Sequence, residues 1–210
     1  MKLALLGGSF DPVHLGHLLV AQAAREELEL TRLFFVPAAQ SPFKPERLPA
    51  PPQERLRLLR LALAGWNWCE IDEQEIHRGG VSYTIDTVRD YVRRFPQAQL
   101  FYLIGADHVA QLPKWREAEA LAKLVEFVVI PRPIIAGSSP NSGILDTASV
   151  GTSRSLDSLL PAPFRGRALT GFPLGVSSSQ IRARVKAGLS IELLTPAAVA
   201  EAIHNNRLYL

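Results

Sequence analysis

The chain has 210 residues, a length that usually forms one domain or at most two small ones. Hydrophobic residues make up 47% of it and charged residues 20%, which excludes a disordered chain, a collagen-like repeat and a disulfide scaffold. The formal net charge is +3, but the basic residues are dispersed, which gives little support to nucleic-acid binding. The densest groups, at Arg55, Arg57 and Arg60 and within residues 89–94, have helical spacing and are interpreted as solvated helix faces.

The cysteine content and the hydropathy of the chain indicate in which cellular compartment the protein works. The single cysteine, Cys69, cannot form an internal disulfide and has no second cysteine at a metal-binding spacing. The apolar run at residues 1–6 is too short for a signal peptide, and no stretch approaches the roughly 20 apolar residues that span a bilayer. We therefore expect a cytoplasmic protein that binds neither membranes nor nucleic acid, with Cys69 in the core.

Short β-rich runs alternate with longer amphipathic runs along the chain. In chain order the pattern predicts a strand at 2–6, a helix at 16–28, a strand at 32–37, a helix at 53–64, a strand at 69–72, a helix at 84–95, a strand at 99–104, a helix at 114–123, a strand at 126–130, a strand at 167–170 and helices at 178–187 and 196–206. The last helix has Thr195 as its expected N-cap and Pro196 at its first position.

This alternation favours a Rossmann-like α/β fold, a doubly wound, mainly parallel sheet with helices on both faces. We expect one domain over residues 1–210, with a C-terminal helical part at about 178–210 packed on it. Residues 37–52 are rich in proline, and residues 131–163 are rich in Ser, Gly and Pro. Both are predicted to be long loops over the edge of the sheet that form mobile parts of a site.

The loop between the first strand and the first helix carries the clearest chemical signal. It reads Gly-Gly-Ser-Phe-Asp-Pro-Val-His-Leu-Gly-His over residues 7–17. In parallel α/β sheets ligands bind at this position, where a strand ends and a helix begins. Gly7 and Gly8 allow the backbone to approach a ligand, so that their amides can hold phosphate oxygens. The spacing matches neither G-x-G-x-x-G nor G-x-x-x-x-G-K-[ST], and thus indicates neither a dinucleotide fold nor a kinase loop.

His14 and His17 place two imidazoles at the start of the first helix. Imidazoles there can donate hydrogen bonds to a phosphoryl group whose negative charge grows during a reaction. For the histidine pair alone, two alternatives stay open: local hydrogen bonding at the helix start and a metal site.

The glycine- and histidine-containing string, together with Ser-Ser-Ser-Gln-Ile-Arg at residues 177–182, resembles the paired signature of H-x-G-H nucleotidyltransferases. Within that superfamily the chain is most similar to the bacterial nicotinate-nucleotide adenylyltransferases, and the resemblance covers nearly the whole chain. The further matches are Pro37 with Ser-Pro-Phe-Lys at 41–44, Ser-Tyr-Thr at 82–84, Ile-Gly-Ala-Asp at 104–107, Pro-Lys-Trp at 113–115, Arg-Pro at 132–133 and Asn-Arg-Leu-Tyr at 206–209. The two end motifs indicate the reaction type, whereas Ser-Tyr-Thr and Trp115 indicate the substrate.

The resemblance implies adenylyl transfer from ATP to nicotinate mononucleotide, giving deamido-NAD (nicotinate adenine dinucleotide) and pyrophosphate, a step of NAD biosynthesis. The acceptor phosphate attacks directly and in line, and because it is already ionised it needs no general base. Mg²⁺ is implied as the companion of ATP, and no metal-binding residues are assigned. The alternatives are the same chemistry on nicotinamide mononucleotide or another phosphate acceptor such as phosphopantetheine, and a non-catalytic nucleotide-binding sensor. The sequence does not decide between a monomer and a homo-oligomer.

The resemblance also implies the site residues, in two overlapping groups. The catalytic residues are His14, His17 and Arg182, which also belong to the ATP site with Gly7, Gly8, Ser9, Phe10, Gly105, Asp107, Arg132, Ser178 and Ser179. The acceptor site is Lys44, Tyr83, Thr84 and Trp115. Ser178, Ser179 and Arg182 would hold the β and γ phosphates. The Trp115 ring would stack on the nicotinate ring, and the Thr84 amide would face its carboxylate.

Plainer roles stay open for some of these residues. Asp107 and Thr84 can each be an ordinary helix N-cap, and Lys44 can be a solvated loop residue. The chain also departs from the family pattern twice. Phe43 stands where the family often has histidine, so no histidine role is transferred there, and Arg116 follows Trp115 where an aromatic or acidic residue is common. The role of Arg116 is left open between carboxylate binding and exposure to solvent.

Overall fold

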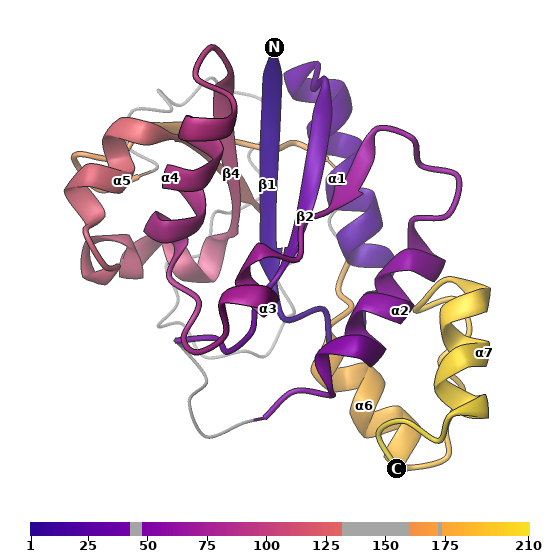
Figure 1. Cartoon of the computed structure of the whole chain (residues 1–210). Helices are drawn as coiled ribbons and strands as arrows, with labels where there is room; N and C mark the ends of the chain where they lie inside the picture. Colours follow the sequence, from indigo (N-terminus) through magenta and orange to yellow (C-terminus); the bar gives the residue numbers. More distant parts are fainter. Residues whose placement is uncertain (43–47, 132–159, 172–173) are drawn as a thin grey trace.

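The computed structural model describes residues 1–42, 48–131, 160–171 and 174–210. Six parallel strands form one sheet in the order β3-β2-β1-β4-β5-β6 (Figure 1). The strands are β1 Lys2–Gly8, β2 Arg32–Pro37, β3 Cys69–Ile71, β4 Gln99–Gly105, β5 Glu126–Ile130 and β6 Gly166–Ala168. This strand order is that of a doubly wound Rossmann-type sheet, and the predicted fold class is confirmed.

Helices connect the strands from β1 to β5, and two further helices follow β6. They are α1 Leu15–Leu28, α2 Pro52–Ala62, α3 Gln74–Arg78, α4 Thr84–Arg94, the 3-10 helix η1 Ala106–Lys114, α5 Ala118–Leu124, α6 Ser178–Lys186 and α7 Ala197–Asn205. No helix within the described ranges has the length and apolar content needed to cross a membrane.

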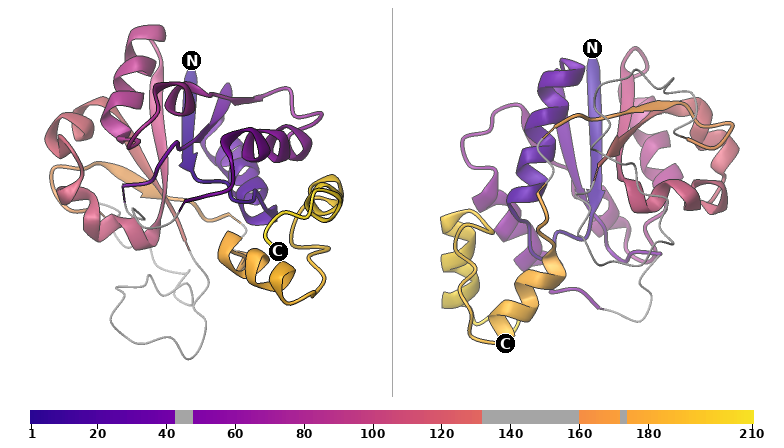
Figure 2. Two further views of the ribbon diagram at one scale, coloured as in Figure 1. Left: turned by 60° about the horizontal axis from the view of Figure 1, so that its bottom comes forward. Right: turned by 180° about the vertical axis from the view of Figure 1, so that it is seen from behind.

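Alternate residues of the central strands face opposite sides of the sheet. Ala4 and Leu6 of β1 pack in one core cluster with residues of α1, α2, α6 and α7. Leu3 and Leu5 pack in a second cluster with residues of α4, η1 and α5. Helix α4 accordingly lies in front of the sheet in Figure 1, whereas α1 lies in front of it in the view from behind in Figure 2. The sheet is thus covered on both faces, as a buried parallel sheet requires.

Two helix boundaries differ from the predictions. The helix predicted at 114–123 is instead the end of η1 followed by α5, because Trp115 is extended and Glu117 has a left-handed backbone with φ 50°. The last helix was predicted to start at Pro196 after a Thr195 cap, but the backbone of Pro196 has ψ 145° and stays outside the helix as its N-cap. Helix α3, only five residues long, was missed.

The interpretation of the first basic group as a solvated helix face was wrong at Arg55. Arg57 and Arg60 do face solvent, with about half or more of each side chain exposed. Arg55 is fully buried, and its guanidinium donates hydrogen bonds to the carbonyls of Ser9, Ala38 and Ala50. The helical spacing of charges does not by itself separate an exposed face from a buried one.

The two predicted loops lie partly outside the described residues. Their described parts, residues 38–42, 48–51, 131 and 160–163, contain no helix or strand, apart from the isolated bridge at Gln40. Pro37 ends β2 and Pro52 begins α2, so the first loop is slightly shorter than predicted. Phe43, Lys44 and Arg132 fall outside the described ranges, and their predicted roles stay predictions.

Candidate active site

A cleft of about 740 Å³ opens at the carboxyl ends of β1 and β4, where the chain changes from one face of the sheet to the other. Ligands bind at such switch points in open α/β sheets, and the volume suits a nucleotide-sized ligand. The predicted site residues that line it are Gly7, Gly8, Ser9, Phe10, His14, His17, Thr84, Gly105, Asp107, Trp115, Ser178, Ser179 and Arg182. Tyr83 is absent from the cleft wall.

The end of β1 must lack side chains because β4 approaches it closely. A Cβ atom at Gly7 would lie 2.4 Å from the hydroxyl oxygen of Tyr102. Burial and the negative charge of Glu75 raise the pKa of the Tyr102 hydroxyl, which therefore stays protonated. Gly7 thus lets the first loop lie against a fixed phenol at the floor of the cleft.

His14 and His17 form a stacked pair at the start of α1. Their ring centroids are 3.7 Å apart, and the backbone N–H of His14 donates to Nδ1 of His17 at 3.2 Å. Because Nδ1 of His17 accepts this bond, the proton of the neutral ring is on Nε2, which makes Nε2 a hydrogen-bond donor. A Cβ atom at Gly16 would lie only 3.0 Å from the His14 ring, so the glycine between the histidines makes room for the stack.

Phe10 supports this pair from the core side. Its ring is buried and contacts the His17 ring edge-on at 5.0 Å and the Phe35 ring at 5.5 Å. Phe10 has a φ of 46°, an unusual backbone for a residue with a large side chain. The turn therefore places the aromatic ring under His17 while the chain continues toward the helix start.

A second helix start meets the same loop from the far end of the chain. Ser177 caps α6, its hydroxyl accepting the N–H of Gln180 at 3.3 Å. The Ser178 hydroxyl donates to the carbonyl of Pro12 at 2.9 Å. Arg182 donates to the carbonyl of Asp11 and to the Ser179 hydroxyl. These bonds hold the N-termini of α1 and α6 side by side at the cleft.

The convergence brings the positive ends of two helix dipoles to the same end of the cleft. At the start of α1 the N–H of Leu15 donates to the Leu194 carbonyl and that of His17 to the His14 carbonyl, and at the start of α6 the N–H of Gln180 donates to the Ser177 hydroxyl. The Arg182 side chain, which is only 16% exposed, adds a full charge within the first turns of α6. Asp11 is buried 3.6 Å from this guanidinium and also accepts the N–H of Ala50. A polyphosphate is the kind of ligand such an arrangement stabilises.

The other end of the cleft is aromatic. Trp115, at the end of η1, contacts the Tyr102 ring at 6.1 Å and the Phe127 ring at 6.2 Å, both edge-on. Thr84 is the first residue of α4 and its hydroxyl lies 3.4 Å from that of Tyr102, but the N-cap of α4 is Tyr83, so Thr84 is not the cap. A half-buried indole beside a helix N-terminus can hold an aromatic ring that carries a negative group.

The two residues on the outer side of this wall contact each other. Arg116 stacks over the Tyr83 ring at 4.6 Å, and one of its nitrogens lies 3.9 Å from the carboxylate of Asp86. Arg116 thus packs on Tyr83 and does not line the cleft. Tyr83 is therefore the N-cap of α4, and its ring packs against Arg116 outside the cleft.

Gly105 and Asp107 lie where β4 passes into η1. Gly105 is the N-cap of η1, so the alternative role of Asp107 as a helix N-cap is wrong. The Asp107 carboxylate lies in the first turn of η1, 3.8 Å from Nε2 of His108. Both side chains border the cleft between the aromatic end and the two helix starts.

Comparison with known proteins identifies the family of this chain. Residues 5–184 match the cytidylyltransferase-like family. A protein of Opitutus terrae named probable nicotinate-nucleotide adenylyltransferase is 37% identical, covering all of this chain and 98% of that protein. One of the same name from Gemmatimonas aurantiaca is 38% identical, covering all of this chain and 92% of that protein. This chain belongs to the nicotinate-nucleotide adenylyltransferase family.

The fold of this nucleotidyltransferase matches solved structures as well. The nicotinic acid mononucleotide adenylyltransferase of Plasmodium falciparum complexed with NaAD superimposes with a TM-score of 0.75 over 99% of this chain and 97% of that chain, at 16% identity. The family predicted from the two motifs and the enzyme class are thereby confirmed.

The sequence reasoning missed four polar residues of this nicotinate-nucleotide adenylyltransferase family member. Asp11 had a signal, since it lies inside the glycine-rich motif. Arg55 and Glu75 had none, because each is a charged residue in a segment that reads as solvated. Ser82 was noticed only as part of a motif. All four are buried: Asp11, Arg55, Glu75 and Ser82.

Metal ligands are not grouped in the part of this family member that the structure describes. Within residues 1–42, 48–131, 160–171 and 174–210, no three His, Cys, Asp or Glu side chains gather closely enough to hold a metal ion. The metal alternative for the stacked histidines therefore finds no third protein ligand among these residues.

Proposed function

We propose that this nucleotidyltransferase moves the adenylyl group of ATP to the phosphate of nicotinate mononucleotide, giving nicotinate adenine dinucleotide and pyrophosphate. The observation that carries the proposal is the meeting of two helix starts, α1 with His14 and His17 and α6 with Ser178 and Arg182, in one cleft whose other end is aromatic. Groups that can bind phosphate and an aromatic ring that can stack on a base thus line one cleft.

The reaction needs positioning and charge stabilisation from the protein. An oxygen of the acceptor phosphate forms a bond to the α-phosphorus of ATP as the bond from that phosphorus to the bridging oxygen breaks, and the electron pair leaves with pyrophosphate. The acceptor oxygen is already ionised, so no residue has to remove a proton. In our proposal Nε2 of His17 donates to the α-phosphoryl oxygens, where charge grows in the transition state, with His14 beside it.

The leaving group needs the second helix start. In our proposal the first amides of α6, beginning at Ser178, the hydroxyl of Ser179 and the guanidinium of Arg182 bind the β and γ phosphates. The Ser178 hydroxyl, which donates to the Pro12 carbonyl, holds the start of α6 against the first loop. The bonds of Arg182 to Ser179 and to the Asp11 carbonyl hold the guanidinium in place before ATP arrives. Preorganised donors of this kind stabilise charge without having to rearrange during the reaction.

The acceptor is assigned to the aromatic end. Trp115 would stack on the pyridine ring and the first amides of α4, at Thr84, would bind its carboxylate. Gly105 and Asp107 would contact the adenosine. Mg²⁺ would enter as part of the substrate, bound to the phosphates of ATP. We also propose that the chain forms one domain, because α6 and α7 pack in the same core cluster as α1 and α2. We propose that it works in the cytoplasm, a reducing compartment that suits a chain with a single cysteine.

Pyrophosphate release by the purified protein tests the function. ATP and Mg²⁺ would be supplied with nicotinate mononucleotide, nicotinamide mononucleotide or phosphopantetheine in separate reactions. We expect release with the acid and much less with the amide, because a carboxylate gains more than an amide from a helix N-terminus. The variant His17→Ala should lose turnover, whereas His77→Ala, whose ring is 75% exposed, should not.

Two other outcomes of this assay would change the proposal. Preference for the amide would keep the chemistry and change the acceptor. ATP binding without pyrophosphate release from any acceptor would refute the proposal and favour a nucleotide sensor.

A further inference from the structure

We propose that Glu27, in the last turn of α1, positions the segment that leads into α6, an inference that rests on the proposed function because it concerns the ATP end of the cleft. This connecting segment comprises residues 169–177, and its described residues, 169–171 and 174–177, contain no helix or strand. It joins β6 to α6, whose first residues are proposed to bind the phosphates of ATP. A segment without regular structure keeps its position through contacts with neighbouring elements.

The Glu27 carboxylate binds two consecutive backbone amides of the connecting segment. One oxygen accepts the N–H of Thr170 at 2.9 Å, and the other accepts the N–H of Gly171 at 2.8 Å. Hydrogen bonds to a charged acceptor are stronger than those between neutral groups. The end of α1 is itself an unfavourable place for a carboxylate, because the negative end of the helix dipole lies there. The two amides therefore stabilise a charge that the helix alone does not favour.

The connecting segment contacts α1 at two further places. Gly171 has a φ of 30°, and a Cβ atom at this position would lie 3.1 Å from the Cβ atom of Ala23. A Cβ atom at Gly16 would lie 3.7 Å from the carbonyl oxygen of Val176. The segment thus meets α1 both near the end of the helix and at its start. In the view from behind in Figure 2, the chain after β6 accordingly reaches α1 and continues toward α6.

The connecting segment and α1 together form one wall of the cleft. Val20 and Ala23 line it from α1, and Gly171, Gly175 and Val176 line it from the segment. Glu27 itself does not line the cleft, so it can act on a ligand only through the segment that it holds. It is therefore a positioning residue.

The contacts of Glu27 restrain one end of the segment, and the start of α6 restrains the other. The Ser178 hydroxyl, at that start, donates to the Pro12 carbonyl of the first loop at 2.9 Å. Together these contacts set where α6 begins relative to the histidines of α1. The acceptor end is formed instead by α4 and η1, which none of these contacts involves. A change at Glu27 should therefore act on ATP and leave the acceptor unaffected.

ATP binding and steady-state kinetics test this role. Calorimetry with ATP and Mg²⁺ in the absence of acceptor measures the dissociation constant directly. We expect Glu27→Ala to raise this constant and the KM for ATP about fivefold, the net effect of about one lost hydrogen bond at an exposed side chain. The KM for nicotinate mononucleotide and kcat should change less than twofold. Glu27→Gln keeps one carbonyl oxygen as an acceptor and should restore part of the loss.

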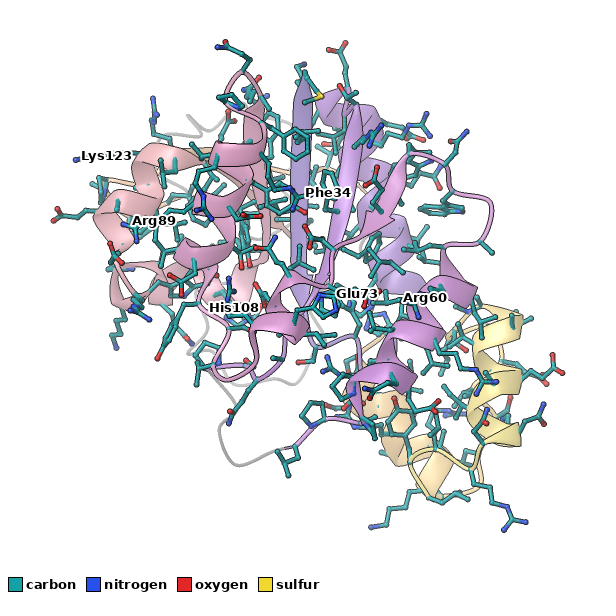
Figure 3. The ribbon with its side chains drawn as sticks, in the orientation of Figure 1. Phe34, Arg60, Glu73, Arg89, His108 and Lys123 are labelled. Carbon is teal, nitrogen blue, oxygen red and sulfur yellow. The ribbon has the colours of Figure 1, made fainter. Side chains whose placement is uncertain are left out.

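Two other glutamates provide matched controls. Glu26→Ala removes the neighbouring carboxylate of α1, which accepts a hydrogen bond from the Gln22 side chain of the same helix at 3.0 Å. Glu73→Ala removes a carboxylate that also joins two elements, since Glu73 at the start of α3 pairs with Arg60 of α2 (Figure 3). Neither glutamate lines the cleft, and both variants should leave the KM for ATP within twofold of wild type.

Hydrogen exchange tests the contact without turnover. In Glu27→Ala the amides of Thr170 and Gly171 should exchange faster than in the wild type, whereas those of α4 should not. Unchanged exchange at these two amides, unchanged ATP binding, or an equal increase in the KM for both substrates would each overturn the inference. If Glu27→Ala does not fold, Glu27→Gln carries the same test.

The proposed function can fail separately. A wild-type protein that binds ATP but releases no pyrophosphate with any acceptor would refute the proposed reaction. The calorimetry and the exchange of Thr170 and Gly171 would still decide whether Glu27 positions the segment.

Discussion

Replacing Arg55 by methionine should strongly lower the free energy of unfolding, although Arg55 does not itself line the cleft. Arg55 is fully buried, and its guanidinium donates at 2.8 Å to the carbonyls of Ser9 and Ala38 and at 3.0 Å to that of Ala50. It joins the first loop to the two ends of the proline-rich loop. Burial lowers its pKa, but an arginine still stays charged at neutral pH.

The size of the effect follows from these bonds. Hydrogen bonds from a charged donor contribute about 1.5–3 kcal/mol each, so three give about 4.5–9 kcal/mol. Methionine removes a charge whose burial itself costs several kcal/mol, which offsets part of this sum. We expect a net loss of about 3–5 kcal/mol in the free energy of unfolding, the range typical of breaking a buried charged contact.

Urea unfolding followed by tryptophan fluorescence would measure this loss, and thermal melting would check it. For a chain of this size about 1 kcal/mol lowers the Tm by about 2–4 °C, so Arg55→Met should melt about 6–20 °C below the wild type. Arg55→Lys should fall in between, since one ammonium cannot reach three carbonyls that the guanidinium fork satisfies.

Arg57→Met is the matched control, two residues along the same helix. The Arg57 side chain is 49% exposed and lies 3.7 Å from Glu54, a surface pair worth little. It should change stability by less than about 0.5 kcal/mol. Equal losses in the two variants, or an Arg55→Met variant as stable as the wild type, would refute the assignment of Arg55 as a structural junction.

Three further predictions concern His17, Gly16 and Cys69. His17→Ala should lower kcat by about 10²–10³ while the circular dichroism spectrum stays unchanged, because a donor to the developing charge is lost; a kcat within a factor of three of wild type would contradict the role. Gly16→Ala should keep the fold but lower kcat, because its Cβ would lie 3.0 Å from the His14 ring, and unaltered turnover would show that the ring position is unimportant. Burial raises the pKa of Cys69 to about 12, so at pH 8 only about one thiol in 10⁴ is ionised and Ellman's reagent should react slowly until urea unfolds the chain; rapid labelling of the native protein would count against it.

Much of the fold was predictable because it depends on patterns that are local in the sequence. Apolar runs such as Leu3 to Leu6 alternate with amphipathic helices, and that alternation is sufficient for a doubly wound parallel sheet. The motif residues of the first loop and of α6 were predictable for the same reason, since each motif is continuous in the chain. Their placement in one cleft agrees with the expected position at the ends of parallel strands.

The rest depends on tertiary contacts that no local pattern reports. Arg55 and Arg57 look alike in sequence, and only the three carbonyls around Arg55 make it a buried residue. Glu75 lies in a helix of five residues, too short for a periodic signal. Glu117 interrupts a continuous amphipathic pattern with a left-handed backbone that its sequence neighbours do not indicate.

The bond from Ser178 to Pro12 joins residues 166 positions apart, and this separation has a consequence for synthesis. A ribosome makes the glycine-rich loop almost first and the start of α6 almost last. The nascent chain can therefore complete much of its sheet while the phosphate end of the cleft still lacks one side. A product that terminates between β6 and Ser178 contains all six strands but lacks the donors of α6, and it therefore has only one side of the phosphate-binding end of the cleft.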